Sequence, residues 1–116
     1  MIKGLCNITF PVSDLKQTVN FYEKILGLKK RFEGSAVVIY DCGIELAFEP
    51  GGTKGKKGDH PYIFLEVANV DAEYRELMDK GVKFRSAPKD EQWGGRTASL
   101  ADPDGNKVVL VQFKTK

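Results

Sequence analysis

Few side chains in this 116-residue sequence have the types and spacing that chemistry needs. There is one histidine, His60, and no suitably placed glycine motif, so neither a nucleophilic triad nor a glycine-rich phosphate loop is indicated. Glu45 stands out because it alternates with apolar residues in "IELAFEP". A carboxylate on such a surface is costly to ionise unless a cation or hydrogen-bond donors meet it. Glu45 is therefore a candidate anchor for a cationic ligand or a general base, or else a surface glutamate that reaches water or pairs with Arg96 or a lysine.

Trp93 is a second candidate, on a connection just before an expected strand in "EQWGGRTA". Its ring could close over a planar or cationic ligand and stack on it. Packing at a subunit interface is the structural alternative. Cys6 and Cys42 have neither C-x-x-C spacing nor companions for a disulfide framework, so we expect free thiols. We expect Cys6 in the core, because it falls on the helix-facing side of its strand.

Composition and charge exclude several classes of function. The net charge of +2 is too small to indicate nucleic-acid binding, and the lysines of "GGTKGKKGD" most simply indicate a solvated loop. No stretch approaches the roughly 20 apolar residues that span a bilayer. The start "MIKGLCNITF" lacks the features of a signal peptide. We therefore expect a cytoplasmic protein that binds neither nucleic acid nor membrane.

The elements that position these residues appear as an internal repeat. "NITFPVSDLKQTVNFYEKILGLK" begins at Asn7, and "YIFLEVANVDAEYRELMDKGVK" begins at Tyr62. Each predicts a strand with apolar residues at alternate positions, followed by a helix capped by Asp14 or Asn69. The offset of 62 − 7 = 55 residues is close to half of the chain. The sequence therefore predicts a duplication.

Three short strands are expected after each helix, around 29–32, 36–40 and 44–48, then around 83–84, 96–100 and 107–113. The predicted fold class is α+β, with two βαβββ modules, about 1–55 and about 56–116, in a single domain 1–116. Each module is too small to bury a good core alone. Placed edge to edge, their mixed sheets would curl into a half-barrel with the helices outside, whose concave face we call the cup.

Alternate side chains of a strand face opposite sides, which selects the residues of the cup. Most of them are apolar or aromatic, and a few carry polar groups that can orient a ligand, as small-molecule sites do. The predicted ligand-binding residues are Asn7, Thr9, Glu45, Tyr62, Phe64, Trp93, Arg96, Val109 and Phe113.

Three motifs resemble those of a known family. "PVSDLKQTVNFYEKILGL", "WGGR" (93–96) and "DPDGN" (102–106) are similar to sequences of the vicinal oxygen chelate superfamily. That superfamily includes glyoxalase I, extradiol dioxygenases, fosfomycin resistance enzymes and bleomycin resistance proteins. The resemblance covers nearly the whole chain. It implies paired βαβββ modules and a two-fold homodimer with cups near or across the interface.

The resemblance also says where a divalent metal would bind. Metal-dependent members of the superfamily place their ligands at positions that correspond here to Asn7, Glu45, Tyr62 and Val109, and Glu45 alone is a plausible ligand. His60 is displaced from Tyr62 by about 6–7 Å along the strand, so a site on His60 and Glu45 is the disfavoured alternative. We therefore expect no metal or other cofactor.

Three functions follow, and whether the protein is an enzyme stays open among them. The favoured one is a small-molecule-binding protein of the glyoxalase/bleomycin resistance type, which takes an organic, possibly cationic or aromatic, ligand in a metal-free cup. The alternative is a metal-dependent lyase, isomerase, dioxygenase or thiol transferase of the same superfamily. The third is a metal-free enzyme with Glu45 as its base, or a structural module without a ligand.

Overall fold

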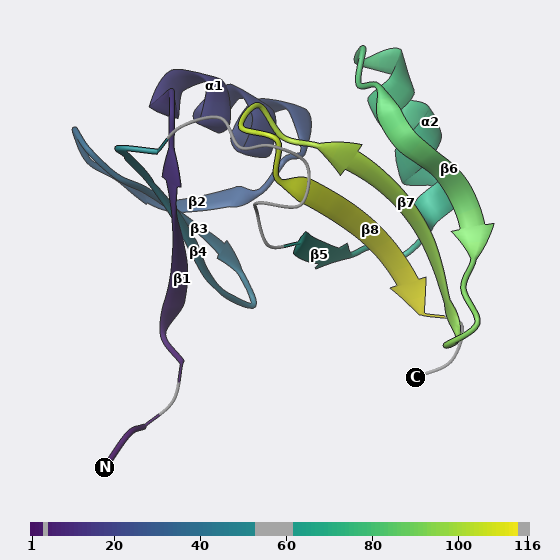
Figure 1. Ribbon diagram of the computed structural model, residues 1–116, viewed down its shortest axis with the longest axis horizontal. Helices are drawn as coiled ribbons and strands as arrows, with labels where there is room; N and C mark the ends of the chain where they lie inside the picture. The colour runs from purple at the N-terminus through teal and green to yellow at the C-terminus, as the bar shows by residue number, and fades with distance from the viewer. Residues whose placement is uncertain (4, 53–61, 114–116) are drawn as a thin grey trace. The chain divides into compact units, whose positions relative to one another are not determined.

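The computed structural model describes residues 1–3, 5–52 and 62–113, and the chain forms two units, Met1–Lys54 and Gly55–Lys116 (Figure 1). The first unit contains β1 (Asn7–Val12), α1 (Leu15–Val19), a π-helical segment (Asn20–Ile25), β2 (Lys29–Glu33), β3 (Val38–Cys42) and β4 (Ile44–Pro50). The second contains β5 (Tyr62–Glu66), α2 (Val70–Asp79), β6 (Phe84–Asp90), β7 (Gly95–Ala101) and β8 (Lys107–Phe113).

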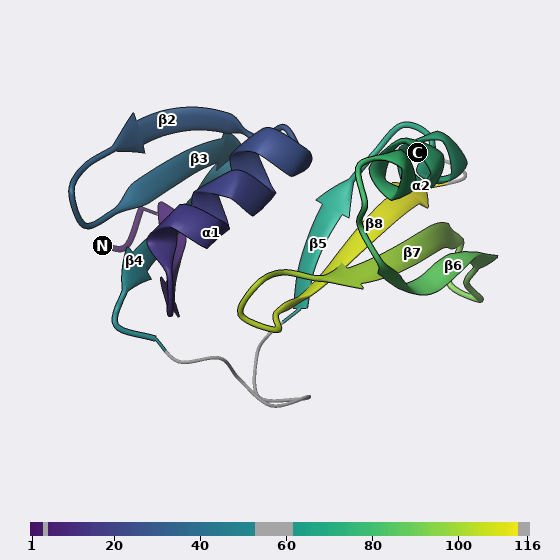
Figure 2. The same ribbon diagram turned by 90° about the horizontal axis from the view of Figure 1, so that it is seen from above.

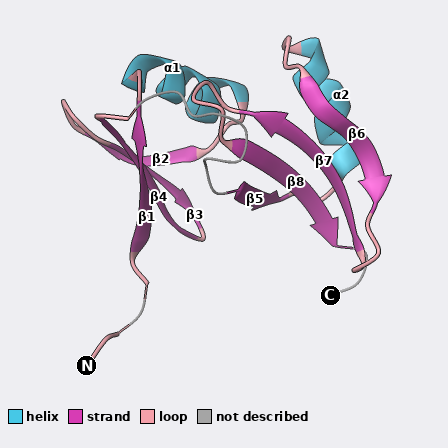
Figure 3. Ribbon diagram, in the orientation of Figure 1, coloured by secondary structure: helices cyan, strands magenta, loops and turns pink. Residues whose placement is uncertain are grey.

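Both units have the same topology. Each holds a four-stranded mixed sheet, in the orders β1-β4-β3-β2 and β5-β8-β7-β6 (Figure 3). The first strand of each unit pairs in parallel with the last, and the remaining pairs are antiparallel. The predicted α+β class and the two βαβββ modules are confirmed. The joint cup of the two modules stays a prediction.

The core of the first unit lies between its sheet and the helical segment after β1. Tyr22 stacks on Phe48 of β4 with ring centroids 4.5 Å apart, and both side chains are fully buried. The hydroxyl of Tyr40, also buried, donates to Glu23 Oε1 at 3.3 Å. These contacts show which face of the sheet is covered, and we call the opposite face of each sheet its open face.

The first helix departs from the continuous α-helix that the sequence predicts. After α1 the chain continues as a π-helical segment, in which the Leu26 N–H donates to the Phe21 carbonyl five residues earlier. Consecutive residues are spread differently around such a wider turn. The neighbouring aromatic residues Phe21 and Tyr22 of this segment are both buried.

The second unit packs α2 against β6, β7 and β8 (Figure 2). Val70 and Leu77 of α2 are buried, as are Ala98 and Leu100 of β7. The predicted turn of "DPDGN" joins β7 to β8. In it, the buried Asp102 carboxylate accepts bonds from two backbone N–H groups and from the Asn106 amide at 2.7–2.9 Å.

Two further expectations concern single features of the chain. Cys6 precedes β1 and is exposed, so its expected place in the core is wrong, whereas both cysteines are free thiols as expected. Cys6 lies outside the alternating part of the strand, where no helix covers it. Across the described ranges, no helix has the length and apolar character needed to cross a membrane.

Candidate ligand-binding site

A cavity of about 200 Å³ lies on the open face of the second sheet. Its walls come from all four strands of that sheet and from the connection between β6 and β7. We call it the β5–β8 pocket, and its lining residues are Tyr62, Phe64, Ser86, Lys89, Glu91, Trp93, Thr97, Ser99, Lys107 and Val109.

Strand register brings these residues together. Tyr62 pairs with Lys107 and Phe64 with Val109 across the parallel β5–β8 ladder, and Ser99 pairs with Val109 across β7–β8. Paired residues project from the same face of a sheet, and alternate residues project from opposite faces. Four of the predicted ligand residues, Tyr62, Phe64, Trp93 and Val109, therefore share one pocket, and Phe113 lies further along the same face of β8.

Trp93 covers one end of the open face. Its ring lies against Gly95, where an added Cβ would collide with the ring. The centroid of the Trp93 ring is 6.2 Å from that of Phe113, with the ring planes at 58°. Trp93 nevertheless stays 56% exposed. The ring is thus placed at the edge of the pocket with much of its surface available for a further contact.

The polar groups of the pocket are hydroxyls and amines. The hydroxyls of Ser86 and Ser99 are hydrogen-bonded at 2.7 Å. Lys107 Nζ lies 4.6 Å from the centroid of the Tyr62 ring, within the range of a cation–π contact. Lys89 Nζ is 3.9 Å from Glu91 Oε1, an ion pair at the limit of contact. The pocket therefore holds two cations and one carboxylate.

Sequence reasoning missed six residues of the pocket, although the signal for three of them was present. Lys107 occupies the same alternating series as Val109 and Phe113. The "DPDGN" turn pairs Ala101 with Lys107, and this pairing places Thr97 and Ser99 on the face of Val109. Ser86, Lys89 and Glu91 could not be placed in this way, because the register of β6 shifts twice.

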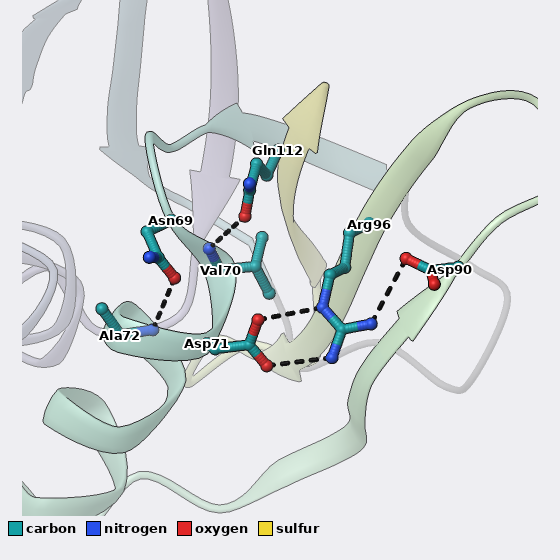
Figure 4. Close-up of polar contacts among 7 residues, drawn as sticks. All are labelled: Asn69, Val70, Asp71, Ala72, Asp90, Arg96 and Gln112. Carbon is teal, nitrogen blue, oxygen red and sulfur yellow. Dashed lines mark hydrogen bonds and ion pairs between the residues drawn. The ribbon is translucent and has the colours of Figure 1, made fainter. Parts of the chain in front are cut away.

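Arg96, predicted as a ligand residue, lies on the opposite face of β7. Its guanidinium donates two bonds of 2.9 Å to the Asp71 carboxylate of α2 and one of 3.3 Å to Asp90 (Figure 4). The alternation of β7 explains the correction, because Thr97 faces the pocket and its neighbour Arg96 must face the helix. Arg96 is therefore not among the residues that line the β5–β8 pocket.

This contact is part of an anchor at the start of α2. Asn69 caps the helix by accepting from the Ala72 N–H at 3.0 Å, and Gln112 of β8 accepts from the Val70 N–H at 2.9 Å (Figure 4). The hydrogen bonds from Arg96 lower the pKa of Asp71. Arg96 also pairs with Asp90, the residue opposite it at the base of the β6–β7 hairpin that carries Trp93. The anchor thus fixes both the helix and the base of that hairpin to the sheet.

On the open face of the first sheet, the predicted polar residues contact one another or neighbouring charges. Thr9 donates its hydroxyl to Asn7 Oδ1 at 3.0 Å, and Asn7 is the register partner of Glu45. Glu45 forms an ion pair with Arg31, and among the described residues it pairs with neither Arg96 nor a lysine. Arg31 was missed because it lies at a register shift in β2, and such a bulge re-aims side chains.

The side chains at the four positions where related enzymes bind a metal are engaged in other contacts or lack a donor atom. In the first unit, the Asn7 amide oxygen already accepts a bond and the Glu45 carboxylate holds a guanidinium. In the second, Tyr62 contacts Lys107, and Val109 has no donor atom. No cluster of three histidine, cysteine or acidic side chains that could hold a metal occurs within the described ranges, and His60 lies outside them. These donors do not fit a divalent ion.

A larger hollow, of about 670 Å³, lies in the first unit beside the start of α1. No aromatic side chain and none of the predicted ligand residues lines it. Asp14, which does line it, already accepts the N–H groups of Lys16 and Gln17 as the cap of α1. We therefore assign the candidate site to the β5–β8 pocket.

The chain thus has two βαβββ modules and a candidate ligand site on the open face of one sheet. The family model of the "Glyoxalase/Bleomycin resistance protein/Dioxygenase superfamily" matches residues 4–110, and the chain belongs to that superfamily. The predicted family is thus confirmed.

Individual relatives cover nearly all of the chain. The YraH protein of Bacillus subtilis is 32% identical, with 94% of this chain and 98% of YraH aligned. The metallothiol transferase FosB of Bacillus licheniformis is 28% identical, over 94% of this chain and 75% of FosB. The bleomycin resistance determinant encoded on the transposon Tn5 has a similar structure, with a TM-score of 0.76 and 25% identity over 97% of this chain and 99% of that one.

Proposed function

We propose that this protein binds a small organic molecule in the β5–β8 pocket without a metal ion. The observation that carries the proposal is that the four positions where related enzymes bind a metal lack a usable set of metal ligands. Asn7, Tyr62 and Val109 are poor or impossible ligands, and Glu45 is neutralised by Arg31. What the pocket offers instead is aromatic surface with a few hydroxyl and charged groups, the usual composition of a small-molecule site.

The relatives support binding, and they also keep an enzymatic alternative open. One structural neighbour is named as a bleomycin resistance determinant, which favours binding of an organic molecule. A relative named as a metallothiol transferase favours metal-dependent group transfer. If this chain shares the latter activity, a partner subunit or His60 must complete a metal site around Glu45.

Measurement of bound metal separates metal-free binding from metal-dependent group transfer. The purified protein is incubated with Ni²⁺, Zn²⁺, Mn²⁺ or Fe²⁺, washed, and analysed for bound metal. We expect far less than one ion per chain. Stoichiometric retention that is lost in Glu45→Gln but kept in Glu49→Gln would replace binding with the metal-dependent alternative. Glu49 is a matched control because it is exposed on the same face of β4.

We further propose that the protein is a cytoplasmic homodimer. The resemblance implies the dimer, and two-fold dimers are the commonest oligomers. Two exposed free cysteines fit a reducing compartment. Light scattering at working concentration is expected to give twice the mass of one chain, and a monomeric mass would contradict the dimer.

A further inference from the structure

The charges of the β5–β8 pocket indicate what its ligand carries. Of the two lysines in the lining, Lys89 has a carboxylate neighbour in Glu91. Lys107 contacts the Tyr62 ring and has no carboxylate partner among the described residues. Lys107 is half-buried on the last strand, between Tyr62 on β5 and Ala101 on β7. Lys107 thus brings a positive charge to the lining of the pocket.

Hydroxyl donors lie on the same face as this amine. Ser99 is the register partner of Val109, and Val109 is the next residue after Lys107 on the open face. Ser99 and Thr97 are buried, and the Ser86–Ser99 pair needs the proton of one hydroxyl, which leaves the other free to donate. An ammonium group beside hydroxyl donors is suited to a carboxylate, which accepts hydrogen bonds and donates none.

The rest of the pocket is aromatic and small. Phe64 and Trp93 line it and are more than half exposed, so their rings offer surface on which a planar group can stack. The volume of about 200 Å³ is below the roughly 300–1,000 Å³ of sites for drug-sized ligands. It therefore suits a single ring with one short substituent, or one end of a larger ligand.

From this arrangement we propose that the ligand is an aromatic carboxylate, with its carboxylate on Lys107 and its ring toward Phe64 and Trp93. This inference rests on the proposed function and specifies the chemical class of the ligand. It replaces the cationic ligand suggested by Glu45, since Arg31 already neutralises that carboxylate.

The chain contains a single tryptophan, Trp93, so its fluorescence reports directly on the edge of the pocket. The titration compares benzoate, neutral benzamide and cationic benzylamine, three probes of similar size and shape. Saturation-transfer NMR detects binding that leaves the fluorescence unchanged. We expect benzoate to bind more tightly than either of the others, and we expect its binding alone to weaken as salt is added, because salt screens the attraction between charges.

Variants test the role of Lys107. Lys107→Met is expected to weaken benzoate binding about fivefold, as for an ion pair with partial solvent access, and to leave benzamide binding unchanged. Lys83→Met is the matched control, because Lys83 is exposed and does not line the pocket. The thermal unfolding midpoint of each variant shows whether it is folded.

The binding experiments can overturn the aromatic carboxylate without overturning the proposed metal-free binding. Benzamide or benzylamine binding as well as benzoate, with no effect of Lys107→Met, would overturn the aromatic carboxylate and leave metal-free binding in place. No response to benzoate in either measurement would also overturn it. Metal-free binding would then depend on the metal analysis, which uses no organic probe.

Discussion

The open faces of the two sheets have the same strand register but carry different side chains at equivalent positions. In the first unit, Asn7, Glu45 and Asp41 are aligned across β1, β4 and β3. In the second, the equivalent positions across β5, β8 and β7 hold Tyr62, Lys107 and Ala101. An amide and two carboxylates are thus replaced by an aromatic ring, an amine and a methyl group. The duplicated backbone constrains position alone, and the side chains decide which module can hold a ligand.

The helix faces differ in the same way. Tyr40 of β3 and Leu100 of β7 are equivalent, because each pairs with the residue that follows Glu45 or Lys107, namely Leu46 or Val108. The first is a tyrosine hydrogen-bonded to Glu23, and the second is fully apolar. Four substitutions test the contacts that distinguish the two units, and they are ordered here by the size of the expected effect.

The largest difference in stability is expected between substitutions in the β7–β8 hairpin and in the β3–β4 hairpin. Asp102→Ala removes a buried carboxylate that accepts three hydrogen bonds, leaving two backbone N–H groups and the Asn106 amide without it. We expect a loss of about 3 kcal/mol in the free energy of unfolding, measured by urea denaturation. Asp41→Ala, at the exposed equivalent hairpin, is expected to cost less than about 0.5 kcal/mol. Equal losses would contradict the assigned difference between the hairpins.

The next substitution concerns the glycines beside the β6–β7 and β2–β3 hairpins. Gly95→Ala places a Cβ against the ring of Trp93 and should displace that ring at a cost of about 1–3 kcal/mol. Trp93 fluorescence should then shift toward that of an exposed indole. Gly34→Ala meets the mobile edge of the Phe32 ring at 3.2 Å, which can give way, so its effect should be smaller. An unchanged Trp93 emission spectrum in Gly95→Ala would contradict the described packing.

Tyr40 provides a pH test of the first helix face. Burial, first, and the neighbouring Glu23 raise the pKa of Tyr40 above the ordinary value of 10.0. The unfolded chain therefore ionises this tyrosine before the folded protein does, and stability should fall as the pH rises above about 10. Tyr40→Phe should lose about 0.5–1 kcal/mol at neutral pH and show less of this alkaline decline. A decline as steep as that of the unmodified protein would show that another group causes it.

The smallest effect is expected at the α2 anchor, because its ion pairs are partly exposed. Arg96 lowers the pKa of Asp71, so the pair stabilises the fold above the unfolded pKa near 3.8, and this contribution is lost as the pH falls through the folded value. Arg96→Gln should lower the thermal midpoint slightly at neutral pH, and the difference should shrink progressively as the pH falls below 3.8. Arg85→Gln, an exposed change in β6, is the control. A difference that persists in acid would assign the effect to packing.

Alternation and capping residues were sufficient to predict much of the fold. Asp14 and Asn69 cap the helices as the sequence indicates, and most strands begin and end within about two residues of their predicted limits. The strand expected around 83–84 is the exception, because β6 continues to Asp90. These features are local, so a short sequence window contains their cause. The repeat offset then predicted that both units share one topology.

The candidate site was less predictable because it depends on contacts between distant strands. Alternation alone brings Tyr62, Phe64 and Val109 to one pocket, but the side of β7 that joins them depends on pairing through the turn, which excludes Arg96. The Arg31–Glu45 pair depends on an irregularity in β2 that no residue type marks. Similarly, helical periodicity predicts a continuous α-helix here and does not indicate the π-helical segment.

Because the first strand of each module pairs with the last, a module can close only after the ribosome has synthesised its last strand. Asn7 must find Glu45, 45 − 7 = 38 residues later, and Tyr62 must find Lys107, 107 − 62 = 45 residues later. At about 5–20 residues per second, each first strand waits roughly 2–9 s for its partner to be made. Pro11, which has no N–H to donate, makes β1 a poorer template for wrong partners during that time. The nascent chain is therefore most open to aggregation just before each module closes.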